Sequence, residues 1–324
     1  MKHLSIIFLS LLMTANLGSI YAQSSGVSKE PLTFDFTVKE TKPPVESVKK
    51  EPVMQTETPK VLVARSDVDV NIPVSNHKNE RTVAVIIAIE NYKYESQVLF
   101  AKNDGETFKQ YCIQTLGLPE KNISFYPDAT LNDIRSAINW LDKVAKAFDG
   151  NGNIIFYYAG HGIPDEKSRS SYLLPQDGYS SDVESGYKID ELYARLGALN
   201  AKSVVLFLDA CFSGAQRGDD MLASVRGVAV RAKQGTPQGN MIVFSAAQGD
   251  ETAHPYKEQK HGLFTYFLLK KLQETEGNVT FGELDKYIIR NVLEQSILVN
   301  KKSQMPVTKP APAMEDIWQD MKLK

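Results

Sequence analysis

A cysteine and a histidine, each just past an apolar run, are the residues whose types and spacing favour nucleophilic chemistry. His161 follows the run at 154–160, and Cys211, 50 residues further on, follows the run at 204–210. A thiolate attacks carbonyl carbon, and a neighbouring imidazole can take the thiol proton as the attack proceeds. We therefore predict that Cys211 is a nucleophile and His161 its base. A metal site is not expected here, because one cysteine and one histidine lack the paired spacing of zinc ligands.

Glycines accompany both reactive residues. Gly160 and Gly162 flank His161, and Gly214 follows Cys211. Glycine permits turns and lets a substrate backbone come close. We predict that the backbone N–H groups of Gly162 and Cys211 bind the oxyanion that develops during acyl transfer.

Alternating apolar runs and helical patterns from Arg81 onward predict an α/β fold with a mostly parallel central sheet flanked by helices. In such sheets reactive groups gather at the carboxyl ends of the strands, where His161 and Cys211 fall. The predicted strands span 83–89, 123–126, 154–158, 204–208 and 241–245. The predicted helices span 104–116, 131–148, 189–199, 263–272 and 281–293, the last opened by a capping-box pattern at Thr280 and Glu283.

The amino-terminal part has a different composition. Residues 1–22 combine a short basic start with an apolar stretch and are typical of a signal peptide, which favours a secreted or periplasmic protein without stable membrane insertion after cleavage. A membrane anchor is the alternative, but the apolar stretch is short. Residues 23–80 are rich in Pro, Lys, Glu and Thr and predict a linker or pro-segment. Residues 311–324 are expected to form a tail.

The charge balance argues against a nucleic-acid partner, and the cysteine positions argue against a disulfide. The 324 residues include 37 basic and 39 acidic ones, so a net charge of −2 gives no reason to expect nucleic acid. Of the two cysteines, Cys112 lies in a predicted helix as a small buried hydrophobe, and we favour two free thiols over a disulfide. His254 and His261 lie in polar sequence and are expected to be exposed.

The motifs around the two reactive residues resemble those of the caspase and metacaspase superfamily of cysteine peptidases. The histidine motif is Tyr158-Ala159-Gly160-His161-Gly162, and the cysteine motif is Asp209-Ala210-Cys211-Phe212-Ser213-Gly214. The cysteine motif departs from the caspase pattern and resembles the metacaspase and wider bacterial caspase-like form. Further matches are the segments 85–92, 101–104, 173–177 and 262–265. The resemblance covers roughly residues 81–306 and implies a three-layer sandwich peptidase domain, taken as 81–310, that cleaves peptides or proteins.

The same resemblance suggests which substrate side chain precedes the cleaved bond. Asp104 stands where metacaspases carry an aspartate in the pocket for this residue, called P1, and Asp209 lies two positions before the nucleophile. A pair of carboxylates favours Arg or Lys at P1 through charge-assisted hydrogen bonds. Cleavage after aspartate would need an arginine in the pocket, and none occurs between Glu90 and Asp104. Ser245, after the fifth strand, is a weaker candidate for substrate binding.

Two further expectations follow from the family. The polar segment 215–239 contains Arg217, Arg226, Arg231 and Lys233, and such a loop is a plausible site of self-cleavage. No cofactor is expected to be required. Some metacaspases bind calcium, and oxygen ligands of the right kind occur at Asp177, Asp182, Asp219 and Asp220.

Two other functions stay open from the sequence. The domain could be a caspase-like binding or scaffolding module whose chemistry is latent or lost. It could also be a cysteine hydrolase or transpeptidase that uses the same dyad on another acyl donor.

Overall fold

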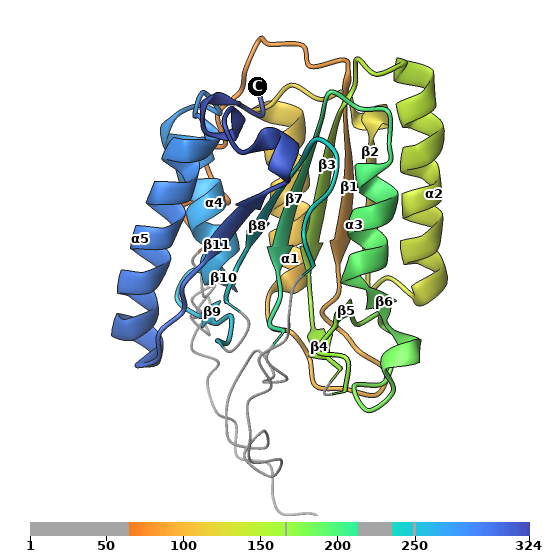
Figure 1. Ribbon diagram of the computed structural model, residues 1–324. Coiled ribbons are helices and arrows are strands. Elements are labelled where there is room, and N and C mark those ends of the chain that lie inside the picture. Colours follow the sequence, from red (N-terminus) through yellow and green to blue (C-terminus); the bar gives the residue numbers. More distant parts are fainter. Residues whose placement is uncertain (1–64, 166, 213–234, 249–250) are drawn as a thin grey trace, which may run out of the picture. The chain divides into compact units, whose positions relative to one another are not determined.

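A six-stranded sheet forms the centre of the molecule (Figure 1). The computed structural model describes residues 65–165, 167–212, 235–248 and 251–324. The strand order is β11-β8-β7-β3-β1-β2, and all neighbours are parallel except β11, which pairs antiparallel with β8. The strands are β1 (Thr82–Ala88), β2 (Ile123–Pro127), β3 (Asn153–Ala159), β7 (Ser203–Asp209), β8 (Met241–Ser245) and β11 (Val307–Pro310).

Helices cover both faces of this sheet. Helix α1 packs against α4, and α4 against α5, whereas α2 contacts α3; α3 and α1 lie on opposite sides of the sheet in Figure 1. The helices are α1 (Ala101–Gln114), α2 (Leu131–Phe148), α3 (Ile189–Gly197), α4 (Leu263–Glu274) and α5 (Phe281–Asn300). This arrangement confirms the predicted three-layer α/β fold with a mostly parallel sheet.

Local sequence explains why these elements form where they do. Every residue of β1 and β7 is buried, as expected for parallel strands covered by helices on both faces. Capping boxes open two helices: Thr130 with Asp133 at α2, and Thr280 with Glu283 at α5. The second box was predicted, and all five predicted strands and five predicted helices are present. Their ends shift by up to three residues, except that α5 continues to Asn300, seven residues past the predicted end.

Short strands gather at the carboxyl ends of the parallel strands, at the bottom of Figure 1. One small antiparallel sheet is formed by β4 (Gly162–Pro164), β5 (Ser171–Leu173) and β6 (Tyr187–Lys188). A second consists of β9 (Pro255–Tyr256) and β10 (His261–Gly262). Because β4 follows β3 and β9 follows β8, these sheets shape the end of the molecule that carries His161 and Cys211.

The end of the predicted linker is part of the folded domain. Val68 is fully buried, and its carbonyl accepts a hydrogen bond from the Tyr111 hydroxyl at 3.0 Å. The backbones of Ser75 and Asn79 bond to those of Gln114 and Gly117. Residues 65–80 therefore run alongside α1, which corrects the expectation of a linker up to Glu80.

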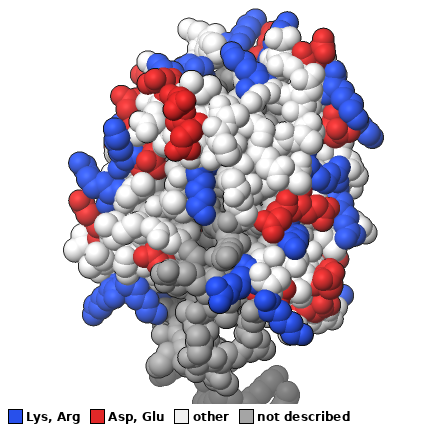
Figure 2. Space-filling model, viewed as in Figure 1, with Lys and Arg blue, Asp and Glu red and all other residues white. Residues whose placement is uncertain are grey.

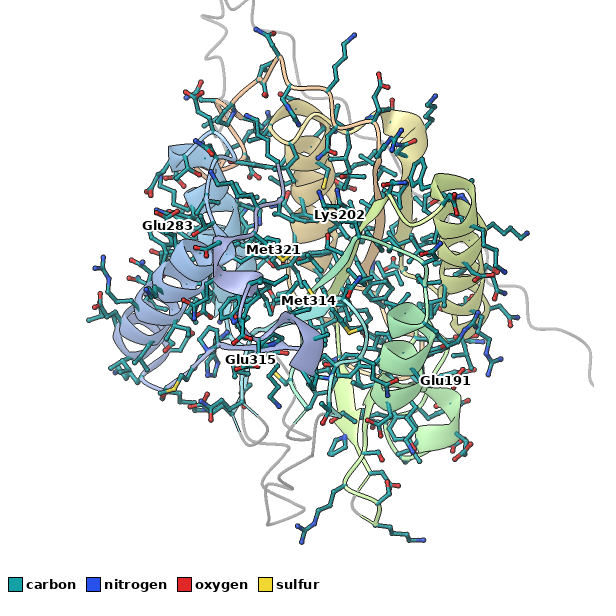
Figure 3. All side chains as sticks on the ribbon, turned by 45° about the horizontal axis from the view of Figure 1, so that its top comes forward. Glu191, Lys202, Glu283, Met314, Glu315 and Met321 are labelled. Carbon is teal, nitrogen blue, oxygen red and sulfur yellow. The ribbon has the colours of Figure 1, made fainter. Side chains whose placement is uncertain are left out.

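The predicted carboxyl-terminal tail is also packed. The Trp318 ring lies 6.5 Å from that of Phe244 on β8, and Phe281 N–H donates to the Met321 carbonyl. Figure 3, with the opposite end of the sheet turned forward, shows Met314 and Met321 near the middle of the view, and Met314 is buried. Residues 311–324 thus close the core beside α5.

The surface carries both charges. Figure 2 shows Lys and Arg side chains interspersed with Asp and Glu over the face in view. Within the described residues, no helix combines the length and apolarity needed to cross a membrane. The predicted signal peptide and the linker up to residue 64 lie outside the described residues.

Candidate active site

The fold brings the His161 and Cys211 segments together. Strands β3 and β7 are parallel neighbours with Ala159 opposite Asp209, and the Gly160 N–H donates to the Asp209 carbonyl at 3.2 Å. His161 and Cys211 each follow their strand by two residues, so both lie at the same edge of the sheet. A Cβ atom placed on Gly162 would lie 2.5 Å from the Cys211 carbonyl oxygen, closer than any real contact. Only glycine therefore fits where the two segments touch.

Three contacts fix the His161 residue. Its ring nitrogen Nε2 lies 2.9 Å from the Ser96 carbonyl oxygen. Its backbone N–H donates to the Tyr92 hydroxyl at 2.6 Å, and the Tyr92 ring lies 4.6 Å from the imidazole. A carbonyl can only accept, so Nε2 carries the hydrogen, and in the neutral ring Nδ1 remains as the proton acceptor. Ser96 thus orients the proposed base through its backbone, which no side-chain pattern could reveal.

The Cys211 thiol is covered by a backbone segment. The side chain is almost fully buried, and Sγ lies 2.7 Å from the Ala253 nitrogen and 3.5 Å from the Ala253 carbonyl oxygen. The sulfur thus accepts a hydrogen bond from the Ala253 N–H and donates its own proton to the Ala253 carbonyl. The same contact places residue 253 against the nucleophile, so substrate must displace or share this position. The other cysteine, Cys112, is buried in α1 as predicted, both thiols are free, and burial raises the pKa of Cys112.

Gln304 holds the segment that covers Cys211. Its side chain is fully buried, donates to the Ala246 carbonyl at 2.9 Å and accepts from the His254 N–H at 2.8 Å. The carboxylate of Glu251 accepts a further bond from the Met305 N–H at 2.7 Å. The loop after α5 thus clamps the loop after β8. Gln304 belongs to no motif in the sequence, so its role could not be predicted from residue types alone.

The two predicted acidic residues converge on the start of α4. Asp209 is fully buried, and its Oδ2 accepts from the Thr265 hydroxyl at 2.7 Å. Asp104 is fully buried in the first turn of α1, and both of its oxygens lie 3.1 Å from the Gly262 nitrogen. A helix amino terminus offers free N–H donors that suit a carboxylate. Both carboxylates thus accept hydrogen bonds from the residues at the start of α4.

His261 is buried, which corrects the expectation that it is exposed. Its Nδ1 lies 2.8 Å from Asp104 Oδ1, and its Nε2 lies 3.1 Å from Asp69 Oδ1. Burial alone lowers the pKa of His261, but the hydrogen bonds and charges of Asp104 and Asp69 outweigh it and raise the pKa to about 9. A protonated His261 therefore joins α1, β10 and the segment at residues 65–80. His254 is also buried, contrary to expectation.

Ser245 and the predicted self-cleavage loop are the remaining candidates from the sequence. Ser245 is buried at the carboxyl end of β8, between Leu208 and Val307 on the neighbouring strands. Most of the predicted self-cleavage loop, including its four basic residues, lies outside the described residues.

The proposed calcium ligands are only partly described. Asp177 Oδ1 accepts from the Leu131 N–H at 3.0 Å, and Asp182 Oδ1 accepts from the Glu184 N–H at 3.1 Å. Asp219 and Asp220 lie outside the described residues. Among the side chains that the structure does describe, no group of three or more His, Cys, Asp or Glu could hold a metal ion. The described aspartates thus serve local turns and caps.

Comparisons with known proteins show the family and similar folds. The family model described as "Caspase domain" matches residues 81–313. No curated protein sequence matches the chain. Caspase-1 from Spodoptera frugiperda is structurally similar, with a TM-score of 0.52 and 17% identity over 76% of this chain and 94% of that one. Protein GSU0716 from Geobacter sulfurreducens is similar with a TM-score of 0.56 and 18% identity, over 75% of this chain and 97% of that one.

Proposed function

Because the chain belongs to the caspase domain family, we propose that it is a cysteine endopeptidase in which Cys211 attacks the substrate and His161 moves the protons. The family match confirms the resemblance inferred from the motifs. The observation that carries the proposal is the contact between the two strand ends, where Gly162 meets the Cys211 backbone and the Ser96 carbonyl holds the imidazole.

The proposed reaction proceeds in two halves. His161 Nδ1 accepts the thiol proton while Sγ forms a bond to the peptide carbonyl carbon, and the Gly162 and Cys211 N–H groups donate to the oxyanion. The C–N bond then breaks, and the imidazolium gives its proton to the leaving amine. Water then attacks the thioester carbon while His161 takes one of its protons. The C–S bond breaks, the imidazolium returns its proton to Sγ, and the amino-terminal half of the substrate leaves as a carboxylic acid that ionises in water. The Ser96 carbonyl serves throughout by keeping Nε2 protonated.

We further propose that the enzyme cleaves after Arg or Lys. In support, the carboxylates of Asp209 and Asp104 are both bound by the residues that open α4, Gly262 and Thr265. The protonated His261 opposes the charge of Asp104 and Asp69, but the three carboxylates of Asp209, Asp104 and Asp69 outnumber this one cation, and a guanidinium or ammonium could offset the remaining negative charge. Ser245, at the end of β8 next to the strand that carries Asp209, remains a candidate contact for the substrate.

The test is hydrolysis of fluorogenic peptides with Arg, Lys or Asp at P1. We expect turnover of the Arg and Lys peptides that is lost in Cys211→Ala and His161→Ala but kept in Cys112→Ala, a matched control because Cys112 is buried in α1. Faster cleavage of the Asp peptide would overturn the proposed specificity. Equal activity of Cys211→Ala and the native protein would overturn the dyad itself.

Latency is a second candidate, favoured by one observation. The Cys211 side chain is only 2% exposed beneath Ala253, so the dyad is covered in this conformation. A scaffold or a zymogen would keep this cover. Labelling of Cys211 by an iodoacetamide probe in the folded protein separates the two: rapid labelling supports an active peptidase, and none supports the latent form.

Self-processing, export and calcium dependence are further proposals for this protein. Cleavage within residues 215–239 would give fragments in the native protein and none in Cys211→Ala, as intact mass would show. Detection of a mature chain lacking residues 1–22 outside the cytoplasm would support export. Activity with calcium compared with a chelator would test the cation, and no step above depends on it.

A further inference from the structure

A pair of stacked tyrosines forms an aromatic surface beside the proposed base. The rings of Tyr94 and Tyr179 lie 4.0 Å apart with an interplanar angle of 15°. They are 44% and 43% exposed, and among the Phe, Tyr and Trp residues that the structure describes, only these two are exposed. We define them as the tyrosine pair. One face of Tyr179 is stacked on Tyr94, and a third flat or apolar group could pack against its other face.

The tyrosine pair is built on two loops that are tied to each other. The Lys93 N–H donates to the Gln176 carbonyl at 2.9 Å, and the Ser180 N–H donates to Glu95 at 2.7 Å. The Tyr179 N–H also donates to the Ser185 hydroxyl at 2.9 Å. These bonds flank the rings on both sides in sequence. The pair is thus held in place by its backbone and would not need to be ordered by a ligand.

The position of the pair relative to the dyad follows from Ser96. The Ser96 carbonyl binds His161 Nε2 at 2.9 Å, and Tyr94 lies two residues before it in the same loop. Two residues span at most about 7 Å. An extended peptide advances about 3.3 Å per residue, so the pair lies within reach of a substrate residue two or three positions from the cleaved bond.

The mechanism of acyl transfer indicates which half of the substrate, before or after the cleaved bond, lies next to the tyrosine pair. The imidazole must reach both Sγ and the nitrogen of the leaving amine, because it takes the proton from one and gives it to the other. The residues after the cleaved bond, called P1′, P2′ and onward, therefore leave along the His161 side. The loop that carries Tyr94 holds the far edge of that imidazole through Ser96.

We propose that the tyrosine pair is a binding subsite for an aromatic side chain at P2′ or P3′ of the substrate. The inference rests on the proposed peptidase function and extends it from the P1 residue to the leaving half of the peptide. Lys93 lies over the Tyr94 ring with Nζ 5.0 Å from its centre, and Tyr179 stacks on the same ring. The occupant therefore packs against the outer face of Tyr179, which Tyr94 supports from behind.

The experiment compares internally quenched peptides that share Arg at P1 and differ only in Phe or Ala at P2′ or P3′. For the native protein we expect kcat/KM to favour the Phe peptide about two- to tenfold, the range of an aromatic contact. Tyr94→Ala and Tyr179→Ala should bring this ratio close to one, while Tyr179→Phe keeps it. Leu298→Ala is the matched control, an exposed apolar residue on α5 that should leave the ratio unchanged.

A coumarin amide of a peptide ending in Arg separates failure of this inference from failure of the proposed function. That substrate ends at P1′, so all variants should hydrolyse it like the native protein. If the native protein does not cleave it, the peptidase proposal fails. If it is cleaved but the Phe and Ala peptides react equally, or the two alanine variants keep the preference, the subsite is refuted.

Discussion

The buried cluster of His261, Asp104 and Asp69 should make stability depend on pH above neutrality. His261 is fully buried between the two carboxylates, at 2.8 Å from Asp104 and 3.1 Å from Asp69. Burial lowers the pKa of this imidazole, but both acids raise it, and the net result is about 9 against 6.5 in the unfolded chain. The folded state therefore binds the His261 proton more tightly than the unfolded state does.

The size of the effect follows from the pKa change. One pKa unit corresponds to about 1.4 kcal/mol, so the rise to about 9 contributes about 3 kcal/mol to the free energy of unfolding. Because the folded pKa is the higher one, this contribution is fully present below about pH 6.5 and is lost as the pH rises through about 9. Removing the imidazole would also leave Asp104 buried beside an uncharged neighbour. This lowers the free energy of unfolding further, by an amount that does not change between about pH 6.5 and 9.

Urea unfolding followed by tryptophan fluorescence would measure the contribution of His261 to the free energy of unfolding, because Trp140 and Trp318 report on α2 and on the packed carboxyl terminus. The free energy of unfolding is compared between the native protein and His261→Gln at several pH values from about 6 to 9.5. We expect the difference to shrink by about 3 kcal/mol across this range. Lys309, whose pKa is lowered by burial, also titrates at alkaline pH, but it affects both proteins alike and cancels. A difference that stays constant with pH would refute a protonated His261.

Two substitutions probe the contacts around Cys211. Gly162→Ala would force a Cβ to 2.5 Å from the Cys211 carbonyl oxygen and the Phe212 ring. We expect kcat/KM to fall at least tenfold, while the free energy of unfolding falls by only about 1–3 kcal/mol. An unchanged kcat/KM would contradict the contact. Gln304→Leu would leave the Ala246 carbonyl and the His254 N–H without their partner, costing about 1–3 kcal/mol and loosening the cover over Cys211. Iodoacetamide should then alkylate Cys211 faster than in the native protein, and an unchanged rate would exclude the clamp.

The predicted elements that proved correct all carry a strong local pattern. The apolar runs 83–88 in β1 and 204–208 in β7 favour strands buried on both faces, and Thr280 with Glu283 is a pattern that opens helices. The elements that were missed lack such a pattern. Strand β11 reads Val-Thr-Lys-Pro, and it forms because β8 offers an open edge far away in the sequence.

The residues whose burial was predicted wrongly also depend on partners that are distant in the sequence. Residues 65–80 are polar and rich in turn formers, yet Val68 is buried because α1 presents Tyr111 and its neighbours to it. His261 lies in polar sequence, but it is buried because Asp104 and Asp69 supply opposite charge from two other segments. Neither partner is near in the sequence, so composition alone indicates exposure.

The sequence by itself determined that a histidine and a cysteine stand past the ends of two buried strands, and its motifs determined the caspase-like family. Only the tertiary structure decided how these residues are held. The Ser96 carbonyl that orients His161 is 65 residues away, and the Ala253 amide that covers Cys211 is 42 residues away. Both contacts are made by backbone atoms, which every residue possesses, so no residue type announces them and only the packing of the chain brings them to the site.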